Sequence, residues 1–137
     1  MQERKYLPTL GELIDRLSIV QLKELLISEH RDEYSKEVVD ILHDIDLIIQ
    51  EEHLQLNANL VRDIMLLMFF NRQIWLNEAN FRKGIKEGNN LELSHGLNGL
   101  RNIAKNKIQT YIGGRKDLKI DCVEAFKEWI PSGYDAT

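Results

Sequence analysis

The residues best suited to bind a charged ligand lie on one face of a helix predicted over residues 93–111. They are separated mainly by three, four or seven positions, which places side chains on the same side of a helix. Arg101 offers a planar fork of donors that matches phosphate oxygens, Lys105 offers a point charge, and asparagine amides both donate and accept. This combination indicates a site for an anion that also carries hydrogen-bonding edges. The face comprises Asn98, Arg101, Asn102, Lys105 and Gln109.

A second interpretation of this face stays open. Its amides and cations can form a solvated surface, or they can hydrogen-bond to the acidic helix predicted after Asp32. An apolar stripe occupies the opposite side of the same helix and is expected to face the core. We therefore expect the polar face to carry none of the core, so that replacing Arg101 leaves the fold intact. The apolar stripe consists of Leu93, Leu97, Leu100, Ala104 and Ile108.

An aromatic ring and an amide share a face of the preceding predicted helix. Trp75 lies four positions after Asn71 and has polar neighbours on its face, as suits a ring that stacks on a nucleobase. Asn71 would then read the edge of that base. The alternative is that Trp75 packs at a contact between helices, with its ring N–H donating to a carbonyl oxygen.

Two cations of the first predicted helix can add positive charge to this site. Arg16 and Lys23 are seven positions apart and therefore lie two turns apart on one face. Arg16 also has a simpler alternative, an ion pair with Asp15 or with the acidic second helix.

A group of acids on the second predicted helix suggests a rival, enzymatic function. Glu37, Asp40 and Asp44 share a face, and all-helical nucleotide pyrophosphohydrolases hold magnesium with such carboxylates. Those enzymes need a second acidic pair on another helix, whereas Glu78 stands alone on the third. We therefore predict no metal site, no cofactor and no catalytic residues, and interpret the acidic face as solvated.

Helical periodicity accounts for most of the chain, and we predict one all-α domain over residues 1–137. Pro8-Thr9-x-x-Glu12 is typical of a helix start, and the first helix is expected to end near Ser28. Further helices are predicted from about Asp32 to residue 52, over about 60–86 and over 93–111. A short last helix is expected near residues 123–130. Short connections favour an antiparallel four-helix bundle.

Composition narrows the partners and the compartment. The formal net charge is −4, which argues against non-specific binding to DNA or RNA. The chain has a single cysteine, Cys122, so it forms no internal disulfide and suits a reducing compartment. Its first residues lack the apolar core of a signal peptide. We expect a cytoplasmic protein.

One apolar segment predicts self-association. Residues Ile64 to Phe70 are hydrophobic all the way around the third helix, yet the run is far too short to cross a membrane. A single bundle covers only part of such a surface, so we expect a homo-oligomer and no membrane contact.

Three stretches resemble a family of small helical phage proteins, the anti-CBASS nucleotide sponges of large tailed phages. They are PTLGELIDRLSIVQLKELLI at residues 8–27, NRQIWLNEANFRKG at 71–84 and LNGLRNIAKNKIQTYIGGRKDLKIDC at 97–122, about half of the chain. The family binds a cyclic dinucleotide signal, such as cyclic GMP-AMP, without cleaving it and so keeps host defence effectors silent.

The resemblance implies a helical oligomer with ligand pockets at or near subunit interfaces, acting in the cytosol of the host. The residues that it implies for the ligand are those already selected by type and spacing: Asn98, Arg101, Asn102 and Lys105, with Asn71, Trp75 and Arg16. Two alternatives remain, the magnesium-dependent pyrophosphohydrolase and a structural or regulatory bundle whose polar face binds another protein.

Overall fold

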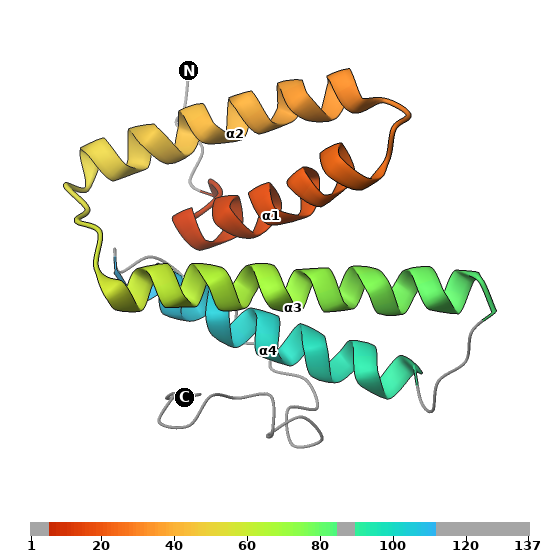
Figure 1. The fold of residues 1–137 in the computed structure, drawn as a ribbon. Helices are drawn as coiled ribbons and strands as arrows, with labels where there is room; N and C mark the ends of the chain where they lie inside the picture. The colour runs from red at the N-terminus through yellow and green to blue at the C-terminus, as the bar shows by residue number, and fades with distance from the viewer. Residues whose placement is uncertain (1–5, 85–89, 112–137) are drawn as a thin grey trace.

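The protein is all-helical in the computed structural model, which describes residues 6–84 and 90–111 (Figure 1). Within these residues there are four α-helices and no β-strand. Their bounds are α1 Leu10–Leu26, α2 Arg31–Glu51, α3 Ala58–Arg82 and α4 Asn90–Thr110. The prediction of an all-α fold is thus confirmed for this part of the chain. The short helix predicted near residues 123–130 lies outside the described residues.

The start of α1 follows from its capping residues. The Thr9 hydroxyl accepts a hydrogen bond from the Glu12 amide at 3.2 Å, and the Glu12 carboxylate accepts one from the Thr9 amide at 3.3 Å. This reciprocal pair satisfies two backbone donors that the first turn would otherwise leave without partners. The helix therefore begins where the sequence pattern predicts.

The four helices form two hairpins, and α1 connects them. Consecutive helices run in opposite directions, with α1 lying between α2 and the α3–α4 hairpin (Figure 1). Among the described residues, α1 approaches each of the other three helices, whereas α2 approaches α1 alone. The N-terminal hairpin is therefore docked onto the C-terminal hairpin through one face of α1.

The apolar core joins side chains from all four helices. Its fully shielded members include Val20 of α1, Leu67 of α3 and Ile108 of α4, while α2 contributes only Ile41 and Ile45 to the buried cluster. Hydrophobic burial is roughly proportional to the apolar area removed from water. Within the described residues, α2 therefore buries the fewest side chains of the four helices.

The apolar segment of α3 is buried on one side only. Leu67 and Phe70 lie in the core, while Met65 and Phe69 are exposed on the outer side of the helix. The sequence predicts self-association through this apolar segment, and the exposed side is the surface that such a contact would use. Self-association stays a prediction. No helix within residues 6–84 and 90–111 is long and apolar enough to span a membrane.

Helices α1 and α4 approach closely at Gly11. A Cβ atom at this position would lie 2.8 Å from the carbonyl oxygen of Lys105 and 3.3 Å from its Cγ atom. The Gly11 amide also donates to the Oε1 atom of Gln109 at 3.0 Å. Glycine is therefore required by the backbone of a neighbouring helix and not by the conformation of its own backbone.

We predict that Gly11→Ala destabilises the protein by about 1–3 kcal/mol, the usual cost of overpacking a close contact. Helix propensity alone predicts the opposite sign, because alanine is favoured over glycine by up to about 1 kcal/mol within a helix. Chemical denaturation of the two proteins measures the difference. Equal or greater stability of the alanine variant would show that α1 and α4 lie further apart.

A buried acid also links α3 to the end of α4. Asp63 is buried, and the hydroxyl of Tyr111 donates to its Oδ2 atom at 3.3 Å. Burial of the phenol, the negative charge of Asp63 and this hydrogen bond together raise the pKa of Tyr111 above its ordinary value of 10.0. The folded protein therefore holds this proton more tightly than the unfolded chain does.

This pair predicts how Tyr111→Phe depends on pH. Near neutral pH the variant should lose about 0.5–1.5 kcal/mol, the net contribution of one hydrogen bond. Above about pH 10 the unfolded chain ionises Tyr111 first, which favours unfolding of the wild type. In urea titrations, the stability difference between the wild type and Tyr111→Phe should therefore be smaller at pH 11 than at pH 8. A difference independent of pH would contradict the raised pKa.

Candidate functional site

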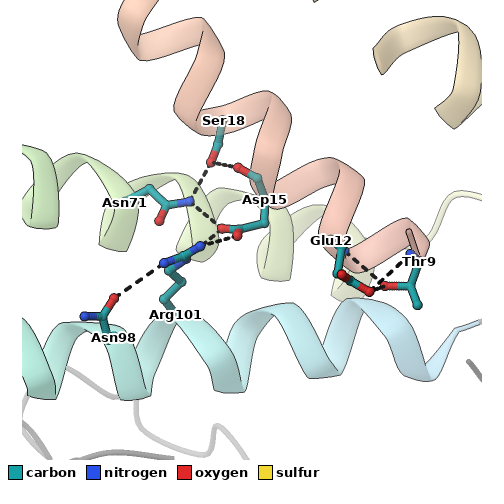
Figure 2. A network of polar contacts seen from close by, with 7 residues as sticks. All are labelled: Thr9, Glu12, Asp15, Ser18, Asn71, Asn98 and Arg101. Carbon is teal, nitrogen blue, oxygen red and sulfur yellow. Dashed lines mark hydrogen bonds and ion pairs between the residues drawn. The ribbon is translucent and has the colours of Figure 1, made fainter. Parts of the chain in front are cut away.

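A buried carboxylate, Asp15, lies at the junction of α1, α3 and α4 (Figure 2). Its Oδ1 atom accepts hydrogen bonds from Asn71 Nδ2 and from Arg101 Nε, both at 2.9 Å. Its Oδ2 atom accepts from Arg101 Nη2 at 2.5 Å. One acid on α1 therefore holds an amide of α3 and a guanidinium group of α4.

Two further residues extend this network on either side. The Ser18 hydroxyl accepts from Asn71 Nδ2 at 2.5 Å and donates to the backbone carbonyl of Asp15 at 2.8 Å. At the other end, Nη1 of Arg101 lies 3.5 Å from Oδ1 of Asn98, one turn earlier on α4. Figure 2 shows this chain of contacts running from Ser18 to Asn98. We call these five residues the junction network.

The burial of the network rises from α4 towards α1. The side chain of Arg101 is 26% exposed, whereas that of Asp15 is 8% exposed. A carboxylate removed from water is stable only when it is paired and hydrogen-bonded, and the side-on contact with arginine supplies both. The arginine in turn is held in one orientation at the edge of the core.

The junction network brings together three of the residues predicted to bind a ligand. Asn71, Asn98 and Arg101 meet through Asp15, although the sequence separates Asp15 from Asn71 by 56 positions and from Arg101 by 86. Lys105 lies one turn beyond Arg101 on α4 and is half-buried. Trp75 is half-buried on α3, one turn beyond Asn71.

The expectation that the polar face of α4 carries none of the core is wrong. Asn102 is 9% exposed and Gln109 is 2% exposed, so this face packs into the protein along part of its length. Gln109 accepts a hydrogen bond from Gly11, while its buried Nε2 atom has no hydrogen-bond partner among the described residues. The polar stripe therefore contributes to the contact between α1 and α4.

Arg16 lies outside the junction network. Its guanidinium group forms an ion pair with Glu37 of α2, with Nη2 at 2.6 Å and Nε at 3.0 Å from the Oε1 atom. Both side chains are exposed to solvent. This contact is the one that the alternative interpretation of Arg16 anticipated, an ion pair with the acidic second helix.

Sequence reasoning missed Asp15 and Ser18 as members of the site. A signal for them exists, because Gly11, Asp15, Ser18 and Leu22 recur at spacings of four, three and four, and all four are buried. A charged residue that falls on a helical stripe of small and apolar residues requires a partner inside the protein.

Within the described residues, no three His, Cys, Asp or Glu side chains gather closely enough to hold a metal ion. Comparison of the chain with protein-family models, with curated proteins and with solved structures found no match. The assignment of a function therefore depends on the geometry of the site and on the resemblance noted in the sequence.

We predict that Arg101→Met destabilises the protein by about 2–4 kcal/mol, because it leaves the buried Asp15 carboxylate without its cation. Adding Asp15→Asn should recover at least about 1 kcal/mol, since the uncompensated charge is then gone. Urea denaturation of the single and double variants measures both effects.

Arg16→Met provides the matched control for this cycle. It removes an arginine next to Asp15 in sequence, but its ion pair with Glu37 is exposed and should contribute no more than about 1 kcal/mol. Equal effects at the two arginines, or strictly additive effects of Arg101→Met and Asp15→Asn, would show that the junction network does not stabilise the fold.

Proposed function

We propose that this protein is a non-catalytic binding protein that sequesters an anionic nucleotide, and that its ligand is a cyclic dinucleotide such as cyclic GMP-AMP. On this proposal it is a phage immune-evasion protein of the host cytosol, acts as a homo-oligomer, and returns its ligand uncleaved. The resemblance of residues 8–27, 71–84 and 97–122 to anti-CBASS sponges supports the identity of the ligand.

The observation that carries the proposal is the fixed orientation of Arg101. Asp15 contacts its guanidinium group through two nitrogen atoms, and the side chain still reaches the surface. A cation whose geometry is set before the ligand arrives loses little conformational entropy on binding. Arginine held in this manner suits the recognition of a phosphate group at the exposed part of its side chain.

The neighbouring residues supply the other interactions that a cyclic dinucleotide needs. Asp15 pairs with Arg101, and Lys105 places a second cation one helical turn away on the same face of α4. Trp75 provides an aromatic surface for a base, and the half-buried amide of Asn98 matches a base edge. Asn71 and Asn102 are buried, so on this proposal they support the site from inside the protein. Arg16 is not included, because it pairs with Glu37 on the outer side of α1.

Binding is best tested through residues that leave the Asp15–Arg101 pair intact. Lys105→Met removes one charge and keeps most of the side-chain stem, and it should weaken the binding of cyclic GMP-AMP by about one to two decades in Kd, the scale of a charge-assisted hydrogen bond. Trp75→Ala should cost a similar factor through lost stacking. Isothermal titration calorimetry on each variant, with its melting temperature, separates lost affinity from lost stability.

The matched control is Lys36→Met, which removes the same charge from an exposed position on α2. It should leave the affinity unchanged. Denaturing the complex and analysing the released nucleotide then distinguishes a sponge from an enzyme. Recovery of intact cyclic GMP-AMP supports sequestration, whereas magnesium-dependent release of pyrophosphate from a nucleoside triphosphate would establish the pyrophosphohydrolase alternative. No binding of cyclic or linear dinucleotides by the wild type would contradict the proposal.

A further inference from the structure

The outer side of α3 carries an exposed apolar stripe with one cation within it. Val61, Met65, Phe69 and Leu76 are 39%, 67%, 46% and 41% exposed, and their spacing places them on one side of the helix. Arg72 falls on the same stripe between Phe69 and Leu76. We call these five residues the α3 outer stripe. An apolar surface of this length on one helix is typical of a contact with another helix.

The outer side of α2 carries a stripe of the same kind with one acid within it. Val39, Leu42 and Ile49 are 62%, 45% and 39% exposed and are spaced three and seven apart. Exposed Asp46 completes the stripe, since it lies four positions after Leu42 and three before Ile49. We call these four residues the α2 outer stripe. Spacings that alternate between three and four are those of helices that pack along one seam.

The two outer stripes are complementary in charge and pattern. Each is apolar apart from one ionisable residue, which is Asp46 on α2 and Arg72 on α3. Arg72 is half-buried, and its Nη1 atom is shielded from water without a hydrogen-bond partner in the part of the chain that the structure describes. A carboxylate is the preferred partner for the part of such a guanidinium group that reaches the surface. A single ionic pair within an apolar seam also fixes the register of two helices.

We propose that two copies of this chain associate by packing the α2 outer stripe of one copy against the α3 outer stripe of the other, with Asp46 paired to Arg72. Within one chain these two helices do not approach each other among the described residues, so the pairing requires a second molecule. The proposal specifies the interface and does not depend on the nature of any ligand.

Charge reversal tests this interface directly. Arg72→Glu and Asp46→Arg should each weaken self-association by about tenfold or more, because each places like charges opposite one another within an apolar contact. In an equimolar mixture, Asp46 of the Arg72→Glu variant faces Arg72 of the Asp46→Arg variant, which is the original pair. In the reciprocal contact, the arginine introduced at position 46 faces the glutamate introduced at position 72. Association should therefore return in the mixture and in the double variant. Sedimentation velocity across the micromolar range measures the mass against the 16.0 kDa chain.

Arg62→Glu is the matched control, since it reverses an exposed arginine of α3 that lies outside the stripe, and it should leave association unchanged. Circular dichroism of each variant establishes that the helices are intact. A variant that loses its helices is replaced by the neutral Arg72→Met or Asp46→Asn. A monomeric wild type overturns the proposal, and so does association that neither reversal weakens or that the mixture does not restore.

Discussion

The position of a single carboxylate governs how the helices of this protein fit together. Asp15 lies inside the junction of α1, α3 and α4, where water cannot solvate its charge. It is stable there only because Arg101 and Asn71 donate to it from two other helices. An isolated buried charge is strongly destabilising, so the folded state requires both donors to be in place around Asp15. The pairing thus specifies the register of α1 against the C-terminal hairpin as well as its contact.

The location of α2 follows from this constraint. Among the described residues, α2 approaches only α1, and it buries little more than Ile41 and Ile45. Helix α2 is therefore held mainly by its packing against α1. Helix α1 is in turn held against α3 and α4 by the junction network and by the close contact at Gly11. This arrangement leaves the opposite side of α2 exposed, with its apolar residues and its acids available to another molecule.

The fold was more predictable from the sequence than the site. Helical periodicity and the capping box at Thr9 and Glu12 are local patterns, so the extents of the helices followed from them. The same patterns show which residues share a face and not what that face meets. The type and spacing of Arg101 predict a binding residue, but its partner Asp15 is 86 positions away. The stripe of α1 indicates that Asp15 is buried and does not indicate which residue pairs with it. Asp15 and Arg16 are adjacent in sequence, yet Asp15 is buried and pairs with Arg101 of α4, whereas Arg16 is exposed and pairs with Glu37 of α2.

The same limit explains why the burial of the polar face of α4 does not follow from the sequence. Asn102 and Gln109 lie opposite the apolar stripe of α4, and in a two-sided helix that position usually faces water. Here α1 covers part of it, and the close approach at Gly11 brings the amide of Gln109 against the first turn of α1. Polar residues that are buried between helices and polar residues that bind a ligand can have the same spacing along the sequence. Only tertiary contacts distinguish them.

Native-state hydrogen exchange tests the central claim, that α1 is anchored to α3 and α4 by the junction network, most directly. Local opening reports the stability of each helix separately. The account predicts that the α1 amides around Asp15 and Ser18 exchange only with the opening of α3 and α4, near the free energy of global unfolding. The amides of α2 should exchange at a lower free energy. If α1 and α2 instead open together while α3 and α4 remain protected, the N-terminal hairpin is a separate unit and Asp15 does not hold the fold together.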